Sequence, residues 1–455
     1  MCGKPGKQKM TTPILDFIRQ YRDSSPVRMH MPGHKGIPLL GAEPMDITEI
    51  DGADELFCPH GVIAESEENA SRLFGCPTWY SAGGSTLCIQ TMTAILCQVA
   101  VNRGQKPKIL AGRNAHRSFV YAAALLGFEI VWLWEVGPIL SCRISPEKLE
   151  EAIARHRPTA VYLTDPDYLG NRADLAGLAR VCHRAGVLLA VDNAHGAYLR
   201  FLPESSHPMD LGADVCCDSA HKTLPVLTGG AYLHLTTAVC EQLQQPVWET
   251  MQLFASSSPS YLILASLDAV NRQLCREYPQ KLRECLVRVK NLKEILTRQG
   301  FRIFGDEPMK ITLCAKEYGY TGTELSAVLQ KNGIVPEFSD PDFLTLMPSP
   351  ENGKEDFSAL QSCLNAVPCR AEISSVPPAF SLPRRGLSVR SARFSKQERL
   401  PVRKAVGRIC ADVSVSCPPA VLPVIPGEIV EESTVSLLEY YGISHIRVVA
   451  APFEK

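Results

Sequence analysis

The feature that most constrains the fold is an alternation of apolar runs and helical stretches between residues 80 and 235. Six short apolar runs recur there, at residues 109–111, 128–134, 160–163, 187–191, 215–217 and 231–235. Stretches with helical periodicity separate them, including residues 85–103, 145–156 and 173–185. Strands that are apolar throughout and separated by helices are typical of a parallel sheet covered on both faces. The sequence therefore predicts an α/β fold whose large domain contains a mostly parallel sheet.

The remaining segments predict further parts. A short helix is expected at residues 11–22, and a long helix interrupted near Pro279 at residues 260–300. A βαβ-like stretch then follows, with a strand at 311–314, a helix at 321–333 and a strand at 343–347. Residues 367–386 are irregular and predict a linker. We expect an N-terminal segment at 1–40, a large domain at 41–300, a small α/β domain at 301–370 and a C-terminal module at 387–455.

Charge and composition exclude several classes of partner. The chain of 455 residues has 47 Lys and Arg against 48 Asp and Glu, so its net charge is −1 and nothing favours nucleic acid or an acidic membrane. No uninterrupted apolar run reaches the ~18 residues of a membrane span, and the polar, basic first ten residues do not resemble a signal peptide. We expect a cytoplasmic protein.

The 17 cysteines are odd in number and form no C-x-x-C pair. A secreted disulfide framework would be evenly paired, and a zinc site would show close Cys and His pairs. Several cysteines instead lie in apolar segments, namely Cys88, Cys97, Cys216 and Cys217. We therefore expect reduced, mostly buried thiols and no metal site.

Chemistry-bearing residues stand at the predicted strand ends, where ligands bind in open α/β sheets. The strand at 187–191 ends on Asp192, and the strand at 215–217 leads to Lys222. Upstream, Gly83-Gly84-Ser85-Thr86 opens a long helix, whose N-terminus suits a phosphate group. A phosphate cradle, a carboxylate and a lysine are together what pyridoxal phosphate needs: the lysine forms a Schiff base, and the carboxylate keeps the pyridine nitrogen protonated.

Each of these signals alone has another explanation. The GGST segment matches neither a dinucleotide fingerprint nor a Walker A loop, Asp192 alone suits a helix cap or a turn, and Lys222 alone suits a solvated surface. A second His-Lys pair, His34-Lys35, lies in a Gly/Pro turn with no strand before it. We therefore prefer Lys222 as the Schiff-base lysine.

Several longer segments resemble a known family. They are MHMPGHKG (29–36), DITEIDGADELFCPHG (46–61), RNAHRS (113–118), VDNAHGAY (191–198), DSAHKTLPVLTGGA (218–231), SSSPSYLILASLDA (256–269) and PPAVLPVIPGE (418–428). The chain resembles the ornithine/lysine/arginine decarboxylases, which are fold-type I pyridoxal phosphate enzymes. The resemblance covers about residues 10–430. The large bacterial members carry an extra N-terminal receiver-like domain, and this chain resembles the shorter form.

The resemblance implies a role for each matching residue. Lys222 would bind the cofactor covalently, Asp192 would pair with the pyridine nitrogen, and His221 or Lys222 would return a proton to Cα. The cofactor-binding residues would be Gly84, Ser85, Thr86, His116, His195, Ser219, His221, Ser257 and Ser258. His116 would stack on the cofactor ring, although a histidine at a helix start needs no ligand. Ser257 and Ser258 would reach the phosphate from the partner subunit, which implies a homodimer with shared active sites, possibly within a higher oligomer.

The sequence departs from the family pattern at three places. Asn193 stands where the family usually has a glutamate, Asp165-Pro-Asp-Tyr168 replaces Ser-Pro-Thr-Tyr, and Val389-Arg-Ser-Ala392 replaces Pro-Arg-Glu-Ala. None of these removes a cofactor contact. The last two put the substrate side in doubt.

The expected activity is α-decarboxylation of arginine, lysine or ornithine, which gives a polyamine precursor and carbon dioxide. Glu337, Asp306 and Glu428 are candidates to bind the cationic end of the substrate, although each alone suits a solvated surface. Two other functions stay open: a different fold-type I reaction, such as transamination or C–S bond cleavage, and a non-catalytic regulatory partner of an active decarboxylase.

Overall fold

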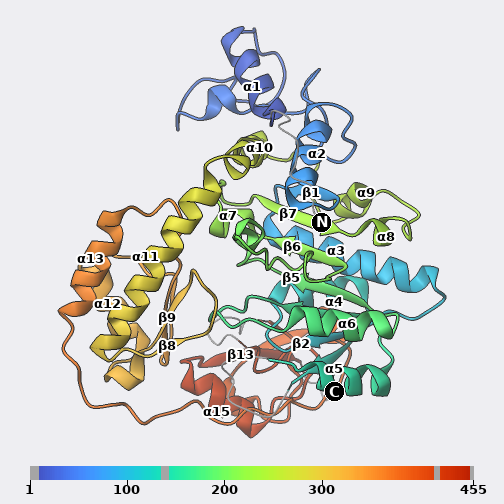
Figure 1. Ribbon diagram of the computed structural model, residues 1–455. Coiled ribbons are helices and arrows are strands. Elements are labelled where there is room, and N and C mark those ends of the chain that lie inside the picture. Colours follow the sequence, from blue (N-terminus) through green and yellow to red (C-terminus); the bar gives the residue numbers. More distant parts are fainter. Residues whose placement is uncertain (1–9, 135–142, 414–420, 451–455) are drawn as a thin grey trace. The chain divides into compact units, whose positions relative to one another are not determined.

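The computed structural model describes residues 10–134, 143–413 and 421–450. The chain divides into two compact units. Unit 1 comprises residues 1–95 and 193–282, and unit 2 comprises residues 96–192 and 283–455. Figure 1 shows the elements of both units. The domain limits expected from the sequence stay a prediction.

Four parallel strands form the centre of unit 2, in the order β5-β4-β2-β3. They are β2 (Lys108–Gly112), β3 (Glu129–Leu133), β4 (Ala160–Thr164) and β5 (Leu188–Asp192). The helices between them are α4 (Arg117–Leu126), α5 (Pro146–His156) and α6 (Leu175–Arg184). Every residue of β5 and all but the last of β4 are buried, as strands covered on both faces require. The predicted parallel sheet is confirmed for these strands.

Three antiparallel strands belong to unit 1, in the order β1-β7-β6. They are β1 (Thr78–Ser81), β6 (Val215–Asp218) and β7 (Ala231–Leu235). The sequence predicted β6 and β7 as strands but not their antiparallel direction. The connection between them contains only the four-residue helix α7 (Ala220–Thr223), which is too short for a crossover to a parallel neighbour.

The helices α1 (Pro13–Asp23), α2 (Val62–Phe74) and α10 (Tyr261–Cys275) pack on one another in unit 1 (Figure 1). The buried carboxylate of Asp268 on α10 joins all three. It accepts hydrogen bonds from the backbone N–H of Leu15 at 2.9 Å and from the Ser66 hydroxyl at 2.5 Å. Two short helices, α8 (Thr237–Cys240) and α9 (Val247–Gln252), precede α10.

A small four-stranded sheet lies in unit 2, in the order β10-β11-β9-β8. Its strands are β8 (Ile303–Phe304), β9 (Ile311–Cys314), β10 (Phe338–Ser339) and β11 (Phe343–Leu346). The helices of this region are α11 (Tyr278–Gln299), α12 (Gly322–Lys331) and α13 (Lys354–Asn365) (Figure 1). The predicted strands and helix are present, but β11 pairs antiparallel with β9 and not as a βαβ unit. The unpredicted strand β10 explains the difference, because the chain turns back from it directly into β11.

The C-terminal residues form a packed module. Strands β12 (Gln397–Pro401) and β13 (His445–Val449) pair antiparallel, and the helices are α14 (Val389–Phe394) and α15 (Glu432–Tyr440). Buried side chains form the module's own core, including Val402, Val430 and Leu438. The preceding residues 368–384 contain no helix or strand, and the linker expected at residues 367–386 stays a prediction.

Helix α3 (Gly84–Asn102) carries the GGST segment at its start. By length and composition it is apolar enough to cross a membrane, but 61% of its most apolar window is buried within the structure. A helix in the core of a soluble protein has the same properties. The cysteines in the described ranges are free thiols, and Cys88, Cys216 and Cys217 are buried.

Candidate active site

Lys222 lies on the one-turn helix α7, directly after strand β6. Its Nζ atom is 2.9 Å from Nε2 of His195, which is 6% exposed. Both residues belong to unit 1. The structure therefore places an amine and an imidazole in direct contact at the position where the sequence predicts the cofactor-binding lysine.

Asp192 is the last residue of β5 in unit 2 and is 2% exposed. The Tyr162 hydroxyl donates a hydrogen bond of 3.1 Å to its Oδ2 atom. The residue is thus a buried carboxylate at a strand end and not an exposed turn residue. Sequence reasoning missed Tyr162. A polar ring within an apolar strand beside the one that ends on Asp192 was the signal that could have found it.

The start of α3 offers room for a phosphate group. Gly84 has a φ of +68°, and a Cβ atom added there would meet no other atom within 4 Å. Its N–H donates to the Gly229 carbonyl at 2.7 Å, which fixes the start of the helix. Ser85 is half-buried and Thr86 is exposed. The first N–H groups of a helix have no partner within the helix and carry partial positive charge, so this position suits an anion.

Ser219 and His221 flank the start of α7. The Nδ1 atom of His221 is 3.1 Å from the Gly230 carbonyl and 3.3 Å from the Ser219 hydroxyl. The carbonyl contact assigns the proton to Nδ1 and fixes the ring. Ser219 is fully buried, so its hydroxyl serves His221 in this structure.

The other predicted cofactor residues are exposed. His116 is the N-cap of α4, where its Nδ1 atom accepts from the Ser118 N–H at 3.3 Å. Ser257 and Ser258 lie on the loop before α10, as the sequence predicts. The residues of unit 1 that the structure places around α7 and the start of α3 are Gly84, Ser85, Thr86, His195, Ser219, His221 and Lys222.

These residues fit pyridoxal phosphate. The open space at Gly84 with the N-terminus of α3 suits the phosphate. Within unit 1, the amine of Lys222 suits the aldehyde. Taken by itself in unit 2, the buried carboxylate of Asp192 has the charge that a protonated pyridine nitrogen needs.

All three substrate candidates have other partners. Glu428 forms a bidentate ion pair with the guanidinium of Arg113, at 2.6 and 2.7 Å, and both side chains are buried. Glu428 is therefore wrong as a substrate ligand. Asp306 accepts from the Arg172 N–H at 2.8 Å, and Glu337 accepts from the Tyr168 hydroxyl at 3.2 Å.

The departures from the family pattern have local explanations. Asp165 pairs with Arg172 at 3.0 Å. Arg390 donates to the Leu125 carbonyl at 2.6 Å, near the end of α4. The amide of Asn193 donates to Asp218 at 2.6 Å. The segment PPAVLPVIPGE lies partly outside the described residues, because its positions 418–420 are not described.

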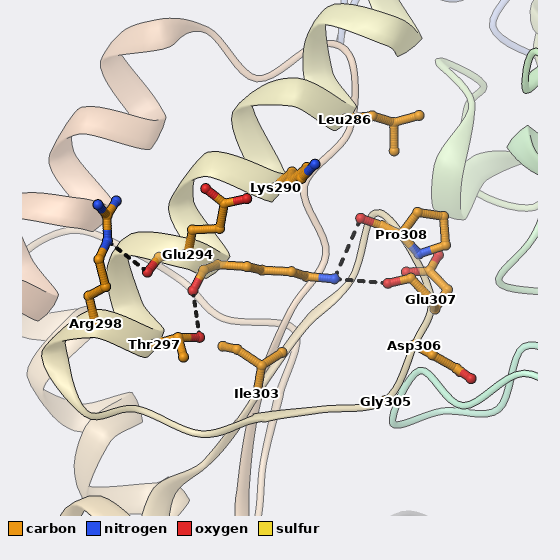
Figure 2. A pocket seen from close by; sticks show the side chains of 11 residues that line it. Leu286, Lys290, Glu294, Thr297, Arg298, Ile303, Gly305, Asp306, Glu307 and Pro308 are labelled. Atoms are coloured by element: carbon orange, nitrogen blue, oxygen red, sulfur yellow. Dashed lines mark hydrogen bonds between the residues drawn. The ribbon is translucent and has the colours of Figure 1, made fainter.

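A cavity of about 780 Å³ lies elsewhere, in unit 2 (Figure 2). Helix α11, Ile303 of β8 and the loop at residues 305–308 line it. Lys293 of α11 lines the cavity and donates to the carbonyls of Glu307 at 2.9 Å and Pro308 at 3.5 Å. Of the residues singled out from the sequence, only Asp306 lines this cavity. The cavity is therefore distinct from the predicted cofactor site.

Known proteins resemble this chain over most of its length. The family model described as Orn/Lys/Arg decarboxylase, major domain, matches residues 12–315, and the model of the C-terminal domain matches residues 388–447. An uncharacterized protein of Bacillus subtilis, YaaO, is 30% identical, and the match covers 94% of each chain. An arginine decarboxylase of Halalkalibacterium halodurans is 29% identical, and the match covers 94% of this chain and 92% of the relative.

Solved structures share the fold. The lysine decarboxylase LdcF of Francisella novicida has a TM-score of 0.78 at 16% identity and covers 97% of this chain and 81% of its own. The constitutive lysine decarboxylase of E. coli has a TM-score of 0.75 at 17% identity, with 97% and 82% covered. The family match and this fold together define a fold-type I enzyme whose cofactor is pyridoxal phosphate.

Within that class, the chain belongs to the Orn/Lys/Arg decarboxylase family. It is an amino-acid decarboxylase, and its cofactor is pyridoxal phosphate.

Proposed function

We propose that the protein removes the α-carboxylate of arginine, lysine or ornithine in the cytoplasm, giving carbon dioxide and a polyamine precursor. The observation that carries this proposal is the contact of Lys222 with His195, on a segment within the range that the decarboxylase family model matches. The proposed substrates are the three amino acids that the family description names.

In this proposal each site residue has its own role. Lys222 holds the cofactor covalently, and Asp192 keeps a proton on its ring nitrogen. The start of α3, with Ser85 and Thr86, binds the phosphate. Ser219, His221 and His116 make the remaining contacts from this subunit. Pyridoxal phosphate, when bound, supplies an electron sink for the electron pair that carbon dioxide leaves behind.

A proton must return to Cα after carbon dioxide leaves, and two groups are candidates for delivering it. His221 is fixed by the Gly230 carbonyl through Nδ1, so Nε2 is the nitrogen left to exchange a proton. Lys222 contacts His195, which can pass a proton to or from its amine. The His221→Gln variant distinguishes these two candidates, because it retains the Lys222 amine while it removes the His221 imidazole.

We further propose a homodimer in which Ser257 and Ser258 complete the partner's site. An exposed apolar loop in unit 1 supports a subunit interface. Six large apolar side chains on it are 68–89% exposed, namely Val27, Met29, Met31, Ile37, Leu39 and Leu40. The loop is held in shape by polar contacts: Arg28 donates to the Pro44 carbonyl at 2.6 Å, and Glu43 accepts from the N–H groups of Leu40 and Gly41. An ordered loop loses little conformational entropy when a partner covers it.

The dimer has its own test. Replacing Leu39 and Leu40 with Ser should raise the dimer dissociation constant in sedimentation, because these side chains are each 89% exposed in one chain. Replacement of Leu382, which is 36% exposed, is the matched control. A monomeric wild-type protein would contradict the proposal.

The activity is tested by measuring carbon dioxide release from arginine, lysine and ornithine side by side, with Lys222→Ala as the control. Arginine is the first substrate to test, because several relatives are named arginine decarboxylase. Keto-acid formation without carbon dioxide would indicate transamination instead. Cofactor bound at Lys222 without turnover of any of the three amino acids would indicate a regulatory partner.

A further inference from the structure

A buried polar cluster surrounds the end of strand β6, directly before the helix that carries Lys222. The proposed mechanism does not use this cluster. Its centre is Asp218, the last residue of β6, which is fully buried. The carboxylate contacts Nε2 of His207 at 3.0 Å, Nε2 of His234 at 3.2 Å and the amide nitrogen of Asn193 at 2.6 Å. All four residues belong to unit 1 and are 0% exposed.

The charges in this cluster balance. Burial acts to raise the pKa of Asp218, but His207 and His234 outweigh it and hold the pKa below its ordinary value. Burial acts to lower the pKa of His234, but the Asp218 charge raises it above its ordinary value. Asp218 is therefore an ionised carboxylate, and hydrogen bonds from both histidines stabilise it. Buried charged clusters are often no more stable than apolar replacements, so stability alone does not account for this one.

Asn193 connects the cluster to the turn that carries His195. Its backbone N–H donates to the Cys217 carbonyl at 3.0 Å, and its carbonyl accepts from the Gly196 N–H at 2.8 Å. Its side-chain oxygen is buried without a partner among the described residues. An unpaired buried acceptor is costly, so what the amide contributes is its N–H bond to Asp218.

Asp218 is also a near neighbour of Lys222 along the chain. It immediately precedes Ser219, whose carbonyl accepts from the Lys222 N–H at 3.0 Å at the start of α7. Asp218 thus holds the His195 turn through the Asn193 amide, and it stands two residues before the helix that carries Lys222. These are the two segments whose side chains meet at 2.9 Å.

We propose that Asp218 is a positioning residue that holds His195 against Lys222 and so sets the rate at which Lys222 captures the cofactor. The inference rests on the proposed role of Lys222. His207, Cys216 and Asp218 also lie close enough together to hold a metal ion. However, Nδ1 of His207 accepts from the Met209 N–H at 3.3 Å, so Nε2 carries the proton and donates it to Asp218. Hydrogen bonds therefore account for the cluster.

Two ligands distinguish a positioning role of Asp218 from a general loss of structure around the cofactor site. Pyridoxal phosphate needs Lys222 for capture, which is followed by visible absorbance and by borohydride fixation to the Lys222 peptide. Pyridoxamine phosphate has no aldehyde, so its affinity reports the phosphate and ring contacts alone. Both are measured on cofactor-free full-length protein, and zinc content is measured in the same samples.

The variants are Asp218→Asn, Asn193→Asp, their combination, and Asp268→Asn as the matched control. Asp218→Asn should slow capture roughly 10- to 100-fold while pyridoxamine phosphate binds as in the wild type, since a displacement of about 1 Å has effects of this size. Asn193→Asp places two carboxylates together and should also slow capture. The combination exchanges donor and acceptor, so it should capture faster than either single variant. The control makes the same change at another buried carboxylate of unit 1 and should capture at the wild-type rate.

Capture at the wild-type rate by Asp218→Asn would overturn the proposal. Equal losses for both ligands, or a combined variant no better than the single ones, would do the same, because a merely structural role predicts them. Stoichiometric zinc in the purified protein would show that the cluster is a metal site and would overturn the proposal. If the wild-type protein shows no labelling at Lys222, the proposed function fails with it, and that failure is seen before any variant is compared. If Asp218→Asn does not fold, Asn193→Ala removes the same N–H bond without adding charge, and normal capture by that variant overturns the proposal.

Discussion

Glu428→Gln should destabilise the C-terminal module without changing substrate recognition. The Arg113 guanidinium is 0% exposed, and its two bonds to Glu428 and one of 2.8 Å to the Leu422 carbonyl satisfy it. A glutamine keeps one acceptor but turns an NH₂ group toward a donor and leaves a buried charge uncompensated. Removing one partner of such a pair costs about 3–5 kcal/mol.

Urea unfolding, monitored by proteolysis within the expected linker at residues 367–386, measures this loss of unfolding free energy. With a urea dependence of ~1–3 kcal/mol per molar, the first unfolding transition should move down by roughly 1 M or more. Replacing both residues, Arg113→Met with Glu428→Leu, should recover most of the loss, because the apolar pair leaves no buried charge. A shift much smaller than this, or a raised KM for the basic amino acid in a fully folded variant, would refute the reasoning and return Glu428 to the substrate site.

The remaining predictions concern the cofactor, the shared site and pH. Borohydride should fix pyridoxal phosphate to the Lys222 peptide, and label at Lys35 would contradict the assignment; Asp192→Asn should retain the cofactor but lose roughly 10²–10³ in turnover. Ser257→Ala with Ser258→Ala should weaken cofactor affinity by ~1.5–3 kcal/mol per lost bond to the charged phosphate. Mixing this variant with Lys222→Ala should restore activity in hybrid dimers. No recovery after proven subunit exchange would assign the loop to its own subunit. Burial raises the pKa of Asp268 to about 7 in the folded protein, so the folded state holds this proton more tightly than the unfolded state and stability falls as the pH rises from about 4 to 7. Asp268→Asn should remove that slope of at most about 1.4 kcal/mol per pH unit in chemical unfolding, and an unchanged slope would show that Asp268 does not cause it.

The sequence predicted most of the fold because apolar runs and helical periodicity are local signals. Strand β9 was predicted at its observed limits, and α10 and α11 were predicted as one helix interrupted near Pro279. Strand direction was harder, since it depends on which strands become neighbours. Strand β11 shows this: its residues were predicted as a strand, but the two-residue strand β10 that turns it antiparallel carries too few residues for a pattern.

The same contrast between local pattern and long-range contacts holds for the candidate site. Lys222 and Asp192 follow apolar strands directly, so their positions could be predicted from local pattern alone. The partners of Glu428 and Asn193 could not, because Arg113 lies 315 residues from one and Asp218 lies 25 residues from the other. Both contacts are between buried side chains that only the folded chain brings together. One of them changes an assignment: Glu428 leaves the substrate candidates once Arg113 occupies its carboxylate.

The Asn193 contact adds a physical reason for a departure from the family pattern. A glutamate at this position would bring a second carboxylate toward Asp218 in a fully buried cluster, where like charges are strongly unfavourable. An asparagine supplies an N–H donor at the same position and leaves its own oxygen unpaired. The identity of residue 193 is therefore coupled to that of residue 218, and Asn193→Glu should be tolerated better together with Asp218→Asn than alone. A coupling energy near zero in that double-mutant cycle would show that the two positions vary independently and that the departure at Asn193 needs another cause.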